Sequence, residues 1–214
     1  MKKIKKEYYF ISILLILLIL FIILTIFVLN DKTLSLDNSA FNNLIKIKNE
    51  PLSKSLFIIT NIGSTIGTVI ALIITCIIFL KRKIFSDFKY VFLNVSVGVI
   101  LMQVIKSLIR RVRPSWKWIV QGGFSYPSGH TITAILFYGT LILLVNKKLK
   151  GKYKTILTVL LSLMIFLIAI SRIYFGAHYL TDVLASIILG SIILIISNSL
   201  MDKEFKNDKN RVKE

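Results

Sequence analysis

Long apolar runs constrain this chain more than any other feature of its sequence. Residues 8–29 contain no charged side chain, and comparable blocks recur along the chain. About 20 apolar residues suffice to cross a bilayer as a helix. The hydrophobic content is 55%, above the roughly 45–50% of soluble domains. The alternating pattern of a membrane barrel is absent, so the sequence predicts an all-α integral membrane protein.

The apolar blocks predict a bundle of six transmembrane helices in a single domain that covers residues 1–214. The first block is longer than the apolar region of a signal peptide, and no small-residue cleavage motif follows it, so we interpret it as a retained helix. The expected spans cover residues 8–29, 56–80, 88–108, 130–146, 153–172 and 179–200.

The net charge of +18 first suggests a nucleic-acid partner, but the position of the charges argues against one. Most of the Lys and Arg residues lie at the ends of apolar blocks, where insertion rules and anionic lipids account for them. They gather at the N-terminus, in "KRKIFSDFK", in "NKKLKGKYK" and in the tail 201–214. With six spans these four segments share one side. The positive-inside rule makes that side cytoplasmic, with both termini there, in a multi-pass protein of the cell membrane.

The first outer loop holds a segment, residues 37–50, with apolar side chains at helical spacing around Phe41 and Ile45. Pro51 follows and is expected to end any helix there. This pattern is typical of a short amphipathic helix on the membrane surface. A simple amphiphilic linker explains it equally well, and the sequence leaves both interpretations open.

Three polar clusters fall on the outer side. The cluster "KSLIRRVRP" places Lys106 and Arg113 seven residues apart, so both can share one helix face until Pro114 breaks the pattern. The cluster "PSGH" opens the fourth span. In "SRIYFGAHYLTD", a histidine and an aspartate at i, i+4 share a face and can form a hydrogen bond. The candidate residues are Lys106, Arg113, Ser128, Gly129, His130, Arg172, His178 and Asp182.

These residue types together favour phosphate chemistry. The cations Lys106, Arg113 and Arg172 can neutralise a phosphate, and Ser128 and Gly129 lie at a helix N-terminus, where anions bind. An acid inside a membrane span is costly and indicates function.

The two histidines then take different roles. His178, oriented by Asp182, suits attack on phosphorus. His130 can donate a proton to the leaving oxygen.

The three clusters resemble the signature of the type 2 phosphatidic acid phosphatases, a family related to vanadium haloperoxidases and glucose-6-phosphatase. The resemblance covers residues 106–182 without departure at a signature position, and the six-span layout extends it to nearly the whole chain. It implies that Lys106, Arg113, Ser128, Gly129 and Arg172 bind phosphate. It also implies a phospho-histidine at His178, supported by Asp182, with His130 as the acid.

The same resemblance implies no metal and no cofactor, and a membrane lipid phosphate as substrate. The chain looks most like small bacterial phosphatases of phosphatidylglycerol phosphate, phosphatidic acid or undecaprenyl diphosphate. The sequence does not rank these lipids, and no required protein partner is evident. Two other functions are an anion or lipid transporter, against which the paired histidines argue, and a vanadate-dependent peroxidase, a soluble class of enzyme.

Overall fold

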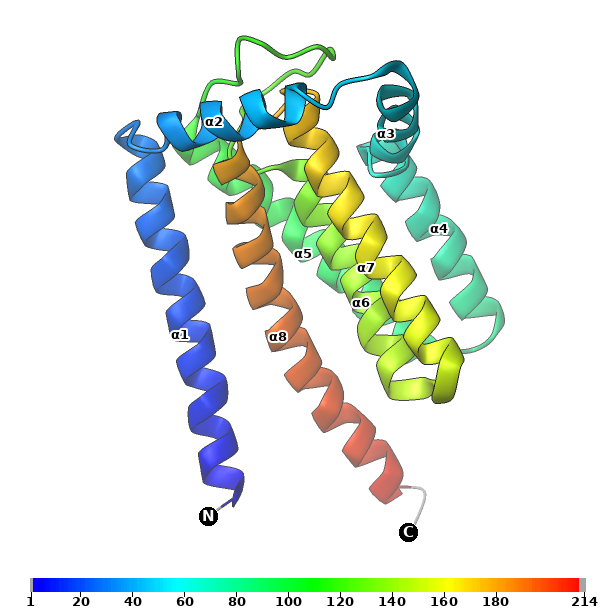
Figure 1. Ribbon diagram of the computed structural model, residues 1–214. Coiled ribbons are helices and arrows are strands. Elements are labelled where there is room, and N and C mark those ends of the chain that lie inside the picture. The colour runs from blue at the N-terminus through cyan, green and yellow to red at the C-terminus, as the bar shows by residue number, and fades with distance from the viewer. Residues whose placement is uncertain (1, 212–214) are drawn as a thin grey trace.

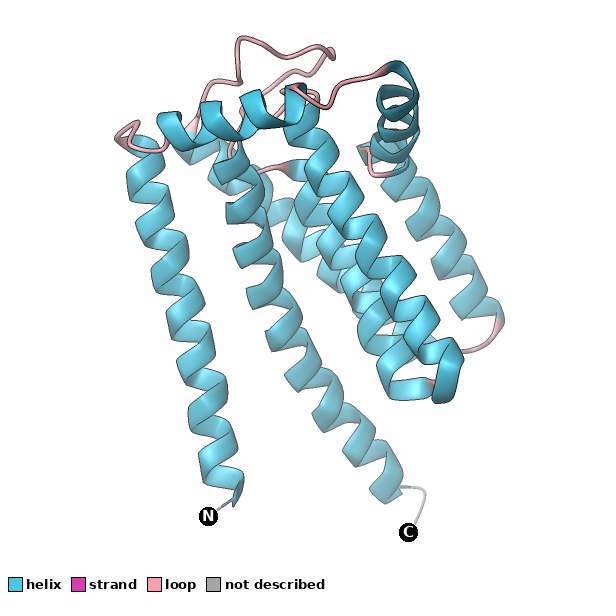
Figure 2. Cartoon of the chain, viewed as in Figure 1, coloured by secondary structure: helices cyan, strands magenta, loops and turns pink. Residues whose placement is uncertain are grey.

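The structure is a computed structural model that describes residues 2–211, and within this range the chain forms eight helices and no strand (Figures 1 and 2). The helices are α1 (Lys2–Leu29), α2 (Leu34–Ile45), α3 (Glu50–Ile62), α4 (Thr65–Lys81), α5 (Phe85–Ile109), α6 (Gly129–Lys148), α7 (Gly151–Tyr174) and α8 (Leu180–Arg211).

Five helices are long and apolar enough to cross a membrane, as the hydropathy predicts: Tyr8–Leu29, α5, α6, α7 and Leu180–Asp202. The sixth span differs from the prediction. Instead of one helix over 56–80, α3 and α4 form a pair bent by 53°. Gly63 follows the last residue of α3, at a point where α7 comes close. A Cβ at this position would lie 2.7 Å from the Ile168 side chain, so glycine fits the available space. The Ser64 side chain then accepts the amide of Gly67 at 3.1 Å and starts α4.

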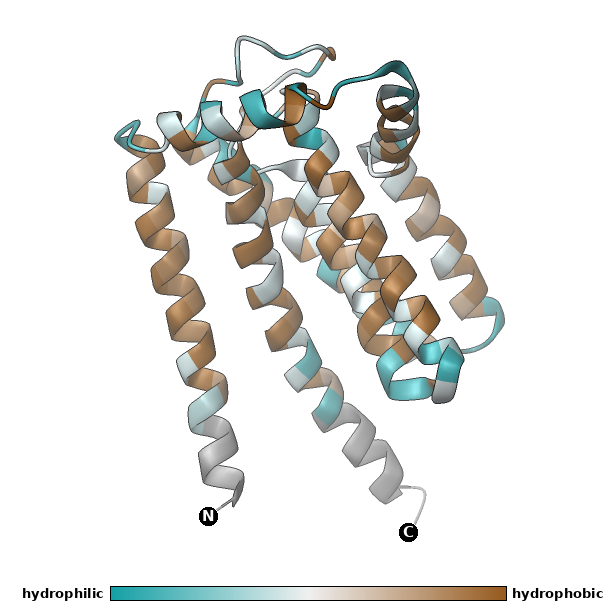
Figure 3. Ribbon diagram, viewed as in Figure 1, coloured by the Kyte–Doolittle hydropathy of each residue, from teal (hydrophilic) through white to brown (hydrophobic). Residues whose placement is uncertain are grey.

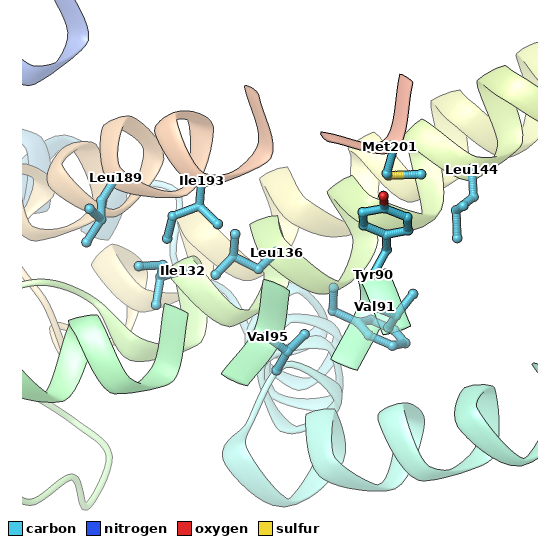
Figure 4. Close-up of a cluster of buried hydrophobic side chains, with 10 residues drawn as sticks. Tyr90, Val91, Val95, Ile132, Leu136, Leu144, Leu189, Ile193 and Met201 are labelled. Atoms are coloured by element: carbon cyan, nitrogen blue, oxygen red, sulfur yellow. The ribbon is translucent and has the colours of Figure 1, made fainter. Parts of the chain in front are cut away.

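Helix α6 is the centre of the bundle, where it packs against α5, α7 and α8. Its buried face joins the apolar cluster of Figure 4, which also draws on α5 and α8. The outward faces of α1, α4 and α7 are exposed and apolar (Figure 3), as lipid contact requires. The cluster comprises Tyr90, Val91, Val95, Ile132, Leu136, Phe137, Leu144, Leu189, Ile193 and Met201.

The two ends of the bundle differ in composition. One end holds the start of α1, the α4–α5 and α6–α7 turns and the end of α8, so the four basic segments gather there (Figure 1). Lys147 binds Asp202 and Lys148 binds Asp87, both at 2.6 Å, which ties α6 to α8 and to α5. The predicted basic tail runs on to residues 212–214, which lie outside the described residues.

The opposite end, which we call the site end, carries α2, α3 and the loop 110–128. Helix α2 lies across the bundle there (Figure 1), so the outer segment is a helix and not a linker. It covers Leu34–Ile45 instead of 37–50. Pro51 does not end it but lies in the first turn of α3, a position that proline favours. Asn49 caps α3 by accepting the amide of Leu52 at 2.8 Å.

Candidate active site

Lys106 and Arg113 reach the site end by a route that differs from the predicted one. Helix α5 ends at Ile109 because Arg110 adopts a left-handed backbone with φ of 51°, and the Arg110 amide bonds to the Lys106 carbonyl at 3.0 Å. The expected shared helix face is therefore wrong. Lys106 lies in the last turn of α5, and the loop that follows brings Arg113 back toward it.

Neutral carbonyl groups accept the hydrogen bonds of these two cations. Lys106 Nζ donates to the Phe124 carbonyl at 2.6 Å. The Arg113 guanidinium donates to the carbonyls of Phe124 at 3.1 Å and Ala177 at 2.7 Å. Its Nε donates to the carbonyl of Gly122 at 3.1 Å. The loop thereby wraps around both side chains without supplying a negative charge.

Arg172 is the third cation, in the last turn of α7, and only 1% of it is exposed. Its guanidinium donates to Thr60 Oγ1 at 2.6 Å and to Gln121 Oε1 at 2.8 Å. Its Nε has no hydrogen-bond partner among the described residues. Thr60 comes from α3 and Gln121 from the loop 110–128, and no pattern in the sequence singled out either residue.

The "PSGH" cluster forms the N-terminus of α6, with Ser128 as the N-cap and Gly129 and His130 in the first turn. A cis Tyr126–Pro127 bond precedes it. The Ser128 amide donates to the Asp182 carbonyl at 3.2 Å, and the Ser128 hydroxyl lies 2.9 Å from Thr131 Oγ1. The start of α6 is thus fixed directly to α8. The cationic side chains that act on the His130 imidazole are those of Lys106, Arg113 and Arg172, and the imidazole of His178 also lies within its reach.

His178 lies in the turn between α7 and α8 and is 2% exposed. Its Nε2 is 3.0 Å from a guanidinium nitrogen of Arg113, which can only donate, so Nε2 must accept. The proton then resides on Nδ1, which faces Asp182 Oδ2 at 3.4 Å. Burial lowers the pKa of His178 to about 3, although the hydrogen bond to Asp182 opposes this shift. The imidazole is therefore neutral near pH 7, with the lone pair of Nε2 directed toward the cations.

Asp182, in the first turn of α8, accepts more hydrogen bonds than the sequence suggested. Its Oδ1 accepts from Arg111 at 2.7 Å. Its Oδ2 accepts the Tyr179 amide at 3.0 Å and the Ser125 hydroxyl, in addition to facing His178. Arg111 lies within the cluster "KSLIRRVRP", and Ser125 lies just before the cluster "PSGH". Neither its spacing nor its residue type marks either of them as a partner of this carboxylate.

The structure thus brings together all eight candidate residues at the site end, from α5, α6, α7, α8 and two loops. Arg113 and Arg172 lie close enough to both histidines to act on them, and Lys106 acts on His130, a constellation suited to binding an anion and transferring a group from it. Across the described residues, no three His, Cys, Asp or Glu side chains are grouped as a metal ion would require.

Comparison with known proteins identifies the family of this chain. Residues 88–206 match the family described as the PAP2 superfamily. Phosphatidylglycerophosphatase B of Bacillus subtilis is 29% identical over 173 residues, which cover 79% of this chain and 85% of that protein.

Two crystal structures share the fold. The transmembrane PAP2-type phosphatidylglycerolphosphate phosphatase of Bacillus subtilis superposes with a TM-score of 0.81 at 26% identity, covering 89% of this chain and 96% of that one. Aquifex aeolicus LpxE shows the same fold at a TM-score of 0.61 and 23% identity, over 78% and 95% of the two chains. The family match covers more than half of the chain, including all three polar clusters. The chain therefore belongs to the PAP2 superfamily and is a membrane-embedded phosphatase of that family.

Proposed function

We propose that this protein hydrolyses the terminal phosphate of a membrane lipid through a phospho-histidine at His178, at the outer face of the membrane. The observation that carries the proposal is the state of the three cations. Among the described residues, Lys106, Arg113 and Arg172 form no ion pair, and their acceptors are neutral: carbonyl, amide and hydroxyl oxygens and the Nε2 atom of His178. Buried charges are normally paired, so this cluster is suited to an anionic ligand.

Phosphate fits this cluster in charge and geometry. It carries about −1.5 to −2 charge near neutral pH, and the planar guanidinium groups suit its oxygens. The unpartnered Nε of Arg172 supplies one further donor. The amides at the start of α6, beside Gly129, supply others, because the first N–H groups of a helix lack intrahelical acceptors.

The proposed reaction has two displacements. First, His178 Nε2 forms a bond to phosphorus while the bond from phosphorus to the lipid oxygen breaks, and His130 gives a proton to that oxygen. Asp182 stabilises the positive imidazole that results. Second, a water molecule attacks phosphorus, its proton passes to His130, and the P–N bond breaks to release inorganic phosphate. The cations around His130 disfavour its protonated form, which the proposed acid requires. The negative charge of the bound phosphate offsets these cations, so His130 can hold its proton in the complex. None of these steps uses a metal or a cofactor.

Phosphatidylglycerol phosphate is the first substrate to test, because the Bacillus subtilis relatives carry that activity in their names. Phosphatidic acid and undecaprenyl diphosphate are the other two. All three end in a phosphate group and an apolar tail that can stay in the bilayer beside the exposed apolar faces of the bundle. No protein partner enters the proposal, and the whole chain 1–214 acts as one membrane domain.

We expect the purified protein in detergent to release inorganic phosphate from phosphatidylglycerol phosphate, and EDTA to leave the rate unchanged. Phosphatidylglycerol, which has no terminal phosphate, is the matched control and should release none. Phosphate is measured colorimetrically, and catalytic efficiencies are compared across the three lipids. A folded protein that releases no phosphate from any of them contradicts the proposal, as does a rate lost with EDTA and restored by a divalent metal.

The basic end of the bundle supports an outer location of the site, because the positive-inside rule favours the cytoplasm for that end. In a Cys76→Ala background, we expect a cysteine introduced by Gly122→Cys to react with an impermeant thiol reagent in intact cells. Gly122 is exposed, and a Cβ there meets no atom within 4 Å. Lys150→Cys, at the exposed basic end, is the matched control and should react only after permeabilisation. The reverse labelling pattern would place the site in the cytoplasm.

A further inference from the structure

A fourth positive side chain, Arg111, lies at the site end but differs from the other three because it is paired with carboxylates. One of its guanidinium nitrogens binds Asp182 Oδ1 at 2.7 Å, and the other binds Asp37 Oδ2 at 2.7 Å. Its side chain is only 9% exposed and stacks over the Tyr179 ring at 3.9 Å. With both of its terminal nitrogens engaged in this way, Arg111 is a link between two acidic side chains and not a free donor for a ligand.

Asp37 connects this link to α2. It lies in the first turn of α2 and is 1% exposed, which is rare for an acidic residue. Besides Arg111, it binds the amide of Thr181 through Oδ1 and the hydroxyl of Thr181 through Oδ2, both at 2.9 Å. Thr181 immediately precedes Asp182, so the carboxylate of α2 holds the turn of α8 that carries the active-site aspartate.

The two oxygens of Asp182 therefore face different sides. Oδ1 faces Arg111, whereas Oδ2 faces His178 Nδ1, the Tyr179 amide and the Ser125 hydroxyl. If the Asp182 carboxylate rotated, its Oδ2 would no longer face the His178 imidazole. The hydrogen bond from Arg111 to Oδ1 opposes that rotation. Burial acts to lower the pKa of Arg111, but Asp182 and Asp37 outweigh it and raise this pKa, so the guanidinium is permanently charged.

We propose that Arg111, held by Asp37 of α2, is a positioning residue that orients Asp182 and sets the charge felt by the nucleophile His178. This inference rests on the proposed function of His178. It gives α2 a role in catalysis, because this surface helix supplies the second carboxylate of the link. Arg111 acts through Asp182 and does not itself contact the phosphate, unlike the three unpaired cations.

The first test compares Arg111→Met with Arg110→Met. Arg110 is the neighbouring arginine, but it is exposed and its Nε bonds only to the Ser107 carbonyl at 2.9 Å. We expect Arg111→Met to lower kcat roughly 10- to 100-fold, by analogy with the loss that follows when the hydrogen-bond partners behind metal-ligating histidines are removed. KM should change far less. Arg110→Met should keep the wild-type kcat. Equal values of kcat in the two variants would overturn the proposal.

The pH profile separates positioning from a merely structural role. The charged groups that face His178 are Asp182 from α8, Arg113 from the loop after α5 and Arg172 from α7, with Lys106 of α5 and His130 of α6 beyond. Without Arg111, the negative charge of Asp182 is less balanced and favours the imidazolium, so the pKa of His178 rises. Because attack needs the neutral imidazole, the acid limb of kcat/KM should move to higher pH in Arg111→Met. An unmoved limb would overturn the electrostatic part of the proposal.

A double variant tests whether Asp37 acts through Arg111. Arg111→Met alone leaves a buried unpaired carboxylate on α2, which can destabilise the fold, whereas Arg111→Met with Asp37→Asn leaves none. We expect the double variant to lose no more kcat than Arg111→Met alone. Asparagine at position 37 keeps an oxygen that can accept the Thr181 amide, so the two changes break the same link. A loss equal to the product of the two single losses would show that Asp37 acts independently. Thermal unfolding in detergent confirms that each variant is folded.

Wild type and His178→Ala are assayed in the same series. If wild type releases no phosphate, or His178→Ala remains active, the proposed function fails. If wild type is active, His178→Ala is inactive and Arg111→Met matches Arg110→Met, only the role of Arg111 fails. The two failures are therefore distinguishable.

Discussion

His178→Ala should abolish phosphate release from every substrate. The change removes the atom that attacks phosphorus, and loss of an enzyme nucleophile lowers kcat on the order of 10⁶-fold. The effect should be equally large for a lipid phosphate and for p-nitrophenyl phosphate, because a better leaving group does not replace a missing nucleophile. The measurement is phosphate release together with acid-labile radiolabel trapped on the protein after a rapid quench.

The control for this prediction is His178→Gln, which retains polarity in a site that is almost fully buried. Both variants should be folded, as judged by thermal unfolding in detergent, and neither should trap label, whereas wild type should. Substantial hydrolysis of the aryl phosphate by His178→Ala would contradict the phospho-histidine mechanism. The unpaired cation cluster would remain a phosphate site in that case, but water would have to attack phosphorus directly.

His130→Ala should show a loss that depends on the leaving group. General acid catalysis contributes about 10²–10⁴-fold. The leaving group of phosphatidic acid is an alcohol that needs a proton, so this substrate should be hydrolysed that much more slowly. The p-nitrophenolate ion departs without protonation, so the aryl phosphate should lose much less. The measurement is the ratio of kcat/KM for the two substrates in wild type and variant. His130 has no hydrogen bond that fixes another site residue among the contacts described above. The ratio of kcat/KM reports only the first displacement, in which His130 is the acid, so its role as the base of the second displacement does not enter the comparison.

The matched control is the same ratio in Arg111→Met, in which both substrates should slow alike because the positioning of the nucleophile is shared. If His130→Ala were equally inactive on both substrates while His178→Ala kept activity on the aryl phosphate, the two histidines would have exchanged roles. A uniform small loss in His130→Ala would instead indicate that another group protonates the leaving oxygen.

Hydropathy and residue spacing predict much of this fold, because each helix that spans the bilayer must satisfy its own backbone and present apolar side chains to lipid. Five spans agree with the prediction within a few residues. The bend between α3 and α4 was not predicted. At the bend, the Ile168 side chain leaves no room for a Cβ at Gly63. These residues are more than 100 positions apart, and no local pattern encodes such a contact.

The candidate site shows the same division. The motifs predict which cations and histidines converge, since their spacing places them at the ends of neighbouring helices. They do not distinguish Arg110 from Arg111, which are identical residues in sequence. The left-handed backbone of Arg110 sends one side chain to the exterior and the other inward. No local pattern marks Asp37 as a residue of the site, because its partner Thr181 lies 144 residues away.

The packing of α1 against α8 has a consequence for the biosynthesis of the protein. Among the main helix contacts, α1 meets only α8, the helix that the ribosome makes last of the eight. At about 5–20 residues per second, α1 waits in the bilayer for roughly 10–30 s before its neighbour arrives. Only 6% of its spanning residues are buried against the rest of the protein. The remaining surface is almost uniformly apolar, so this helix can stay in the bilayer alone. Asp182 arrives with α8, so under the proposed mechanism we expect the nascent chain to stay inactive toward the surrounding lipids until the ribosome has made the start of this helix.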